Sequence, residues 1–145
     1  MDSLQPVFIA LGGLIAFVVI WLFVVLLTSW MSGWSKLADV YPARRPFNET
    51  CWSLQSGRFR WGMGYNGVLK VCADTQALHL SVFMFFRPGH PPLSIPWEDI
   101  TGRKRTFWIE LRFHRAEDIP LRISSRLAGQ LEQAASGMWQ HEKEI

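Results

Sequence analysis

The chain has 145 residues, with 15 Lys and Arg against 12 Asp and Glu, and a formal net charge of +3. This mild excess, without a dense Lys/Arg stripe, excludes a dedicated nucleic-acid binder. The charges are unevenly spread, because every Lys and Arg lies after residue 35. The N-terminal part, which lacks basic residues, is therefore expected to form a different kind of structure from the rest of the chain.

The first predicted element is an uncharged run from Val7 to Leu27. As a helix it would be about 31 Å long, close to the thickness of the hydrocarbon layer, and it is apolar on every side. No Lys or Arg precedes it and residues 28–34 make a poor cleavage site, which argues against a signal peptide. Residues 1–29 are therefore predicted to form an N-terminal tail and a retained single-pass transmembrane helix.

The charges that flank this run predict its orientation. Lys36, Arg44 and Arg45 follow it, whereas no basic residue precedes it. The positive-inside rule then places the N-terminus outside and the following domain on the cytoplasmic side. We expect the membrane to be a bacterial inner membrane. In that compartment Cys51 and Cys72 are expected to be free thiols, but with the opposite orientation they could pair.

Residues 30–50 are predicted to form a juxtamembrane segment. Trp30, Trp34, Leu37 and Tyr41 recur at helical spacing, which favours a continuation of the membrane helix or a short helix at the interface. A plain linker is the alternative. An irregular segment follows over residues 42–57, with a first edge strand around Trp52 to Leu54.

After Arg58 the apolar residues alternate with a period of two, which predicts strands. We expect a hairpin whose loop is the three residues Tyr65–Gly67, with Gly67 in the left-handed region, since a two-residue loop would turn one apolar set to the wrong face. The predicted cross-strand pairs are Met63 with Leu69, Trp61 with Val71 and Arg58 with Asp74.

Further strands are expected over 77–86, which is apolar enough for a central strand, and over 93–97, where Pro96 requires a sheet edge. In 106–114 alternation predicts Phe107 inward and Trp108 outward, and residues 119–123 repeat this pattern. A C-terminal helix capped by Ser124 or Ser125 would present one apolar stripe: Leu127, Leu131, Ala134 and Met138.

The stretch LSVFMFFRPGHPPLSIPWEDI, residues 80–100, resembles the strand–loop–strand pattern of bacterial pleckstrin-homology-like and GRAM-like membrane proteins, in which an I-P-[WY]-x-x-I strand recurs. The resemblance covers residues 52–139. It implies an α+β domain over 51–139, a bent antiparallel sheet or partial barrel closed by the C-terminal helix, with 140–145 as a tail. It implies a fold and no activity.

No pattern in the sequence predicts catalysis. The four histidines lack metal-ligand spacing, and the chain contains neither a nucleophile elbow nor a phosphate-binding Gly-rich loop. We therefore expect no enzymatic activity, no catalytic residues, no metal site and no cofactor.

Two binding hypotheses remain, both with membrane lipids around the helix. In the first, the chain is an accessory or scaffolding subunit of an integral membrane complex. Gly12 and Ala16 form a small-xxx-small face for another helix, and the other candidate partner contacts are His90, in a rigid loop, and Trp108. The sequence predicts neither the partner nor the oligomeric state.

In the second hypothesis the domain senses anionic lipid headgroups through basic residues near the leaflet. The candidates are Arg44, Arg45, Arg103, Lys104 and Arg105. The phosphoinositide-binding members of the resembling superfold carry their basic motif across the first hairpin, and this chain lacks it there. The departure counts against a specific inositol-phosphate site.

Overall fold

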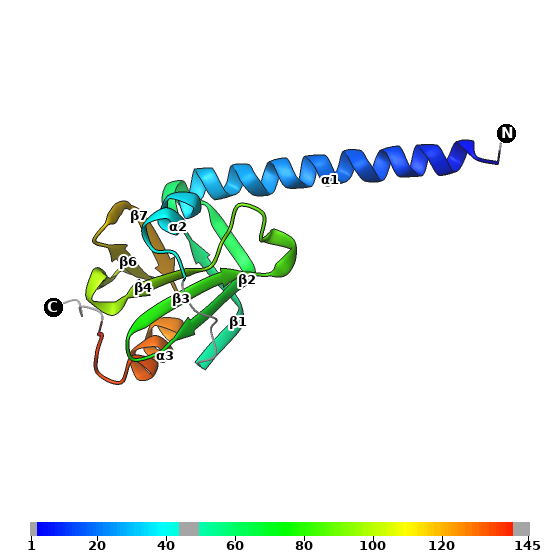
Figure 1. Ribbon diagram of the computed structural model, residues 1–145. Coiled ribbons are helices and arrows are strands. Elements are labelled where there is room, and N and C mark those ends of the chain that lie inside the picture. The colour runs from blue at the N-terminus through cyan, green and yellow to red at the C-terminus, as the bar shows by residue number, and fades with distance from the viewer. Residues whose placement is uncertain (1–2, 44–49, 141–145) are drawn as a thin grey trace.

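The computed structural model describes residues 3–43 and 50–140. A long N-terminal helix projects from a β-sheet domain, and a short C-terminal helix lies on the domain away from it (Figure 1). The helices are α1 (Gln5–Ser32), α2 (Trp34–Val40) and α3 (Ser125–Ala135). Among the described residues α1 is the one helix long and apolar enough to cross a membrane.

The sheet has seven strands in the order β4-β3-β2-β1-β7-β6-β5, all antiparallel, and it is not closed into a barrel. The strands are β1 (Thr50–Arg58), β2 (Gly64–Ala73), β3 (Ala77–Val82), β4 (Leu93–Pro96), β5 (Ile100–Lys104), β6 (Ile109–Phe113) and β7 (Ala116–Ile123). Short 3-10 turns are η1 (Arg60–Gly62), η2 (Met84–Phe86) and η3 (Trp97–Asp99). The first strand was expected at an edge, but β1 is the central strand.

Gly33 separates α1 from α2 with a left-handed φ of 89°. A Cβ at this position would lie 2.7 Å from Cδ1 of Ile119, so only glycine allows α2 to pack so closely on β7. Beyond this break Trp34, Leu37 and Tyr41 are buried in the core, whereas Trp30 is exposed. The predicted helical stripe therefore belongs to the domain and not to the membrane interface, except for Trp30.

The first hairpin differs from the prediction. The chain reverses at η1, and residues 65–67 lie inside β2, where the register with β1 shifts between Gln55 and Gly57. Gly67 has a φ of 70° and its N–H donates to Oγ of Ser56, so it marks a β-bulge and not a turn. The observed pairs include Trp52 with Val71 and Arg58 with Gly64.

The edge position of β4, predicted from Pro96, is confirmed. By contrast, the strand expected over 77–86 ends at Val82 and the chain continues into η2, where Met84 and Phe85 are exposed and Phe86 packs against the core. Similarly β6 begins only at Ile109, so Phe107 lies in the preceding turn and is 81% exposed. The inward prediction for Phe107 is therefore wrong.

Helix α3 closes one side of the core as predicted. Its N-cap is Ser124, whose Oγ accepts a hydrogen bond from the N–H of Leu127 at 3.1 Å. Leu127 and Leu131 are buried, but the helix ends at Ala135 and leaves Met138 exposed. The expectation that Met138 extends the apolar stripe is wrong, and Trp139 takes the buried position instead.

Cys51 and Cys72 form a disulfide between β1 and β2. The two residues are direct partners in the antiparallel register, with Cα atoms 4.0 Å apart. Neighbouring antiparallel strands bring such opposed side chains within bonding range. The expectation of free thiols, which rested on a cytoplasmic domain, is therefore wrong, and the cysteines pair as expected for the opposite orientation.

Candidate functional site

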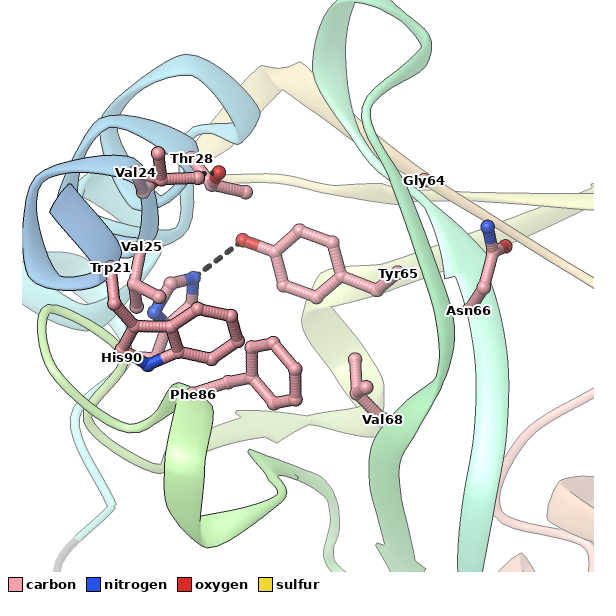
Figure 2. A pocket seen from close by; sticks show the side chains of 10 residues that line it. All are labelled: Trp21, Val24, Val25, Thr28, Gly64, Tyr65, Asn66, Val68, Phe86 and His90. Atoms are coloured by element: carbon pink, nitrogen blue, oxygen red, sulfur yellow. Dashed lines mark hydrogen bonds between the residues drawn. The ribbon is translucent and has the colours of Figure 1, made fainter. Parts of the chain in front are cut away.

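The most distinctive site is the junction between α1 and the sheet. Figure 2 shows side chains from α1, from β2 and from the loop after η2 around one groove of about 280 Å³. We call it the helix–sheet groove. Its lining residues are Trp21, Val24, Val25, Thr28, Gly64, Tyr65, Asn66, Val68, Phe86 and His90.

The last turns of α1 are built for close approach to the domain. Of its residues only Val25, Ser29 and Ser32 are buried, and their spacing places them on one helical face. The hydroxyl of Ser29 donates to the carbonyl oxygen of Gly89. Gly89 has a φ of 70°, and a Cβ there would lie 2.8 Å from Cδ2 of Leu26, so the loop needs glycine at this contact.

A chain of hydrogen bonds crosses the junction from helix to loop. Oγ of Ser32 lies 2.8 Å from the hydroxyl of Tyr65, which lies 2.6 Å from Nε2 of His90 (Figure 2). The Nδ1 of His90 lies 2.9 Å from the carbonyl oxygen of Pro88. A carbonyl can only accept, so Nδ1–H donates; in the neutral ring Nε2 then accepts from Tyr65, and Tyr65 accepts from Ser32.

Burial keeps both titratable groups of this chain neutral. Tyr65 is 4% exposed, and burial raises the pKa of its hydroxyl to about 12, opposed by the hydrogen bond from Ser32. Burial lowers the pKa of His90, opposed by its hydrogen bonds to the carbonyl groups of Pro88 and Phe86. The result is a neutral connection with its polar groups satisfied, which fixes the relative position of helix and sheet.

An aromatic cluster surrounds this chain. Trp34 is fully buried and stacks on Tyr65, with ring centroids 5.8 Å apart. It also contacts Phe59 and His90, and its Nε1–H donates to the carbonyl oxygen of Pro91 at 2.9 Å. The core of the domain therefore includes α2, which follows α1 directly.

Charged groups complete the junction at the end of α1. The guanidinium of Arg60 donates to the carbonyl oxygens of Trp30 at 2.9 Å and Met31 at 3.3 Å, which caps the helix C-terminus. Asp118 binds Nζ of Lys36 at 3.0 Å and lies 3.6 Å from the same guanidinium. These contacts link η1, α1, α2 and β7.

The structure separates the predicted partner contacts. Gly12 and Ala16 are exposed on the half of α1 that extends beyond the domain, and no atom lies within 4 Å of a Cβ built at Gly12. His90 is 3% exposed and hydrogen-bonded inside the junction, so it is not available to a partner surface. Trp108 is half-buried, with the guanidinium of Arg122 5.2 Å from its ring centroid.

Of the five predicted lipid contacts, the structure describes Arg103, Lys104 and Arg105. Arg44 and Arg45 lie outside the described residues. Arg103 and Lys104 end β5, and Arg105 binds the buried carboxylate of Glu110 at 3.1 Å. This hairpin closes beside Ile123, next to α3, whereas α2 contacts the other half of β7 through Lys36 and Asp118.

No group of three metal-binding side chains occurs in the part of the chain that the structure describes. Sequence reasoning missed Ser32, Trp34 and Tyr65 as site residues, because Tyr65 was assigned to a turn. The one available signal was the run of small polar residues, Thr28, Ser29 and Ser32, directly after an apolar span.

No protein-family model matches the chain, and neither the comparison with curated proteins nor that with solved structures found a match.

We expect the junction to make stability pH-dependent through His90. Because its pKa is lower in the folded state, the unfolded chain binds more protons below the ordinary value of 6.5. The stability contributed by neutral His90 is therefore complete above pH 6.5 and is lost as the pH falls below it. Melting of the full chain in detergent between pH 7.5 and 5 measures this loss.

The variant His90→Gln should show a smaller loss over this range, because the glutamine oxygen can accept from Tyr65 without titrating. His114→Gln is the matched control, since His114 is exposed, and it should keep the parental slope. Equal slopes for His90→Gln and the parent would contradict the neutral hydrogen-bond chain.

Proposed function

We propose that the chain is a non-enzymatic accessory or scaffolding subunit of a membrane protein complex, anchored by α1 and contacting partners through its β-domain. The observation that carries the proposal is the junction itself. A tether needs no fixed geometry, yet here hydrogen bonds of Ser29 and Ser32 hold the end of α1 to the domain, and Trp34 of α2 packs into the core of the sheet. Such a design holds a surface at a set position relative to a partner in the bilayer.

The free half of α1 supports a helical partner. Its side chains are exposed from Val7 to Ile20, and Gly12 and Ala16 lie one turn apart on one face. Small residues at this spacing allow a second helix to approach closely in lipid. At the other end, Phe107 and Met138 are exposed on the domain and offer apolar contacts outside the membrane.

We also propose that the domain is pleckstrin-homology-like. Its strand order places β4 and β5, which are consecutive in sequence, at opposite edges of one antiparallel sheet, and α3 packs on that sheet. This arrangement supports the resemblance of residues 52–139 to the bacterial membrane proteins of that class. The resemblance supplies an architecture for binding and no chemistry.

For orientation we propose that the domain faces an oxidising compartment outside the cytoplasm. The Cys51–Cys72 disulfide supports this side, because structural disulfides persist where thiols are not kept reduced. The basic residues after α1 favour the cytoplasm through the positive-inside rule. One of them, Lys36, is also accounted for by its ion pair with Asp118, which weakens this argument. The disulfide is the stronger argument, since it belongs to the folded domain.

Gentle detergent extraction of the tagged full chain, followed by mass spectrometry, tests the subunit proposal. We expect a stoichiometric set of membrane proteins that is lost from the double variant Gly12→Leu/Ala16→Leu. The matched control is Leu14→Phe/Val18→Phe, which adds bulk on another side of α1 and should keep the partners. A chain that extracts alone and pellets with anionic liposomes would favour the lipid-sensing alternative instead.

A further inference from the structure

The turn η2 carries an aromatic tip that no part of the domain covers. Phe83, Met84 and Phe85 are 46%, 61% and 62% exposed, and the rings of Phe83 and Phe85 lie 5.4 Å apart. Three adjacent large apolar side chains at the end of one loop form a surface that water-soluble domains rarely expose. We call Phe83–Phe85 the η2 tip.

The η2 tip lies beside α1 and level with Trp21. The indole N–H of Trp21 donates to the carbonyl oxygen of Phe85 at 3.0 Å, and its ring centroid is 5.1 Å from that of Phe86. Figure 1 shows the green turn after β3 reaching along the helix in the direction of the N-terminus. The loop therefore follows α1 away from the body of the domain.

The sequence of α1 sets the depth of this contact. Exposed apolar side chains continue to Leu27, and Thr28 is the first polar residue after them. Trp21 lies six residues before Leu27, which is about 9 Å along a helix. If α1 spans the bilayer with its apolar run in the hydrocarbon, Trp21 and the η2 tip lie inside that layer.

An interfacial belt marks the boundary independently. Trp30 and Trp61 are 61% and 64% exposed and contact each other edge to face, with ring centroids 6.2 Å apart. The guanidinium of Arg60 lies 4.3 Å from the centroid of Trp61. Exposed tryptophans beside a cation are typical of the headgroup layer, and Trp21 is about 14 Å further along the helix from Trp30.

Several polar groups of the loop are paired, which lowers the cost of placing them in hydrocarbon. The Trp21–Phe85 hydrogen bond satisfies an indole donor in the middle of an apolar helix and a backbone carbonyl at the tip. The N–H of Phe83 donates to the carbonyl oxygen of Val68, and that of Phe86 donates to Phe83, each at 2.8 Å. Arg87 follows η2 and is exposed, so its long side chain can reach back to the headgroups.

We propose that the η2 tip inserts into the acyl-chain layer of the leaflet on the side of the domain. The occupant of this apolar surface is thus lipid hydrocarbon, and not a second protein. The domain then has two membrane attachments, α1 and the η2 tip, which prevent its rotation about the helix axis. The inference rests on the proposed anchoring by α1, and the experiment below separates the two.

Spin labels on the full chain in liposomes test the insertion. Labels at Met84→Cys and Phe85→Cys report the tip, Val19→Cys reports the exposed span, and Phe107→Cys reports the water-exposed turn before β6. The native disulfide stays closed during labelling, and unmutated protein gives the blank. Collision rates with oxygen, which partitions into hydrocarbon, and with a water-soluble nickel chelate measure the depth of each label.

We expect the tip labels to match Val19→Cys, with high oxygen and low nickel accessibility, while Phe107→Cys shows the reverse. Tip labels that behave like Phe107→Cys, with Val19→Cys still in hydrocarbon, would overturn the insertion and leave the anchor standing. A water-accessible Val19→Cys would overturn the anchor first, and the insertion with it.

Discussion

Replacing Leu131 with aspartate is expected to abolish the cooperative thermal unfolding of the β-domain. Leu131 is 1% exposed and belongs to the hydrophobic core. An unpaired carboxylate placed there costs several kcal/mol, against about 5–15 kcal/mol for the total stability of a typical domain. Near-ultraviolet circular dichroism of the full chain in detergent, followed during heating, measures the loss.

The matched control is Gln133→Asp, which introduces the same charge on the same helix at an exposed position. It should melt like the parent. If Leu131→Asp also melts like the parent, α3 is an appendage and does not close the core. The full chain is needed for this test, because α2 contributes Trp34 and Leu37 to the core and a fragment beginning at residue 42 would lack them.

The elements that the sequence predicted well are those with strong local signals. Helix α1 follows from its length and uniform apolarity, the start of α3 from Ser124, and the edge position of β4 from Pro96. In each case one local feature of the sequence suffices: a long uncharged apolar run, an N-cap side chain, or a missing N–H.

The first hairpin was misplaced because its turn depends on distant contacts. Gly62, with a φ of 71°, is a local turn signal in η1, but Asn66 and Gly67 form a stronger one. Trp61 also adopts a φ of 61° in η1. The turn is held by Arg60, which reaches the carbonyl groups of Trp30 and Met31 across the junction. Asn66 and Gly67 are typical turn residues, but here they form a bulge that directs Tyr65 inward.

The candidate site was unpredictable for the same reason. Its groups come from residues 21–34, 59–68 and 86–90, which meet only after the sheet forms. A period-two pattern of apolar residues also does not predict the residue at which a strand ends. The apolar run through Phe86 was therefore assigned wholly to a strand, whereas the strand ends at Val82 and Phe83–Phe85 form the exposed η2 tip.

The disulfide leads to an all-or-none prediction about the side of the membrane. Alkaline phosphatase fused after Ile145 is expected to be active, because this enzyme works only outside the cytoplasm. A green fluorescent protein at the same position is expected to be dark, because it does not fluoresce when it is exported to that side. Cys51 and Cys72 should resist alkylation in cells until a reductant is added. Three basic residues after the span, Lys36, Arg44 and Arg45, oppose this orientation through the positive-inside rule.

The Cys51→Ser/Cys72→Ser variant is the control that connects orientation to folding. The disulfide closes a loop with a sequence separation of 21 residues, for which chain entropy gives roughly 3 kcal/mol of stability. The parent should therefore melt higher than the variant when purified without reductant, and the difference should vanish in dithiothreitol. The opposite result would be a fluorescent fusion and cysteines that are alkylated without prior reduction. It would show that the flanking charges decide the orientation, and that the two thiols only face each other across β1 and β2.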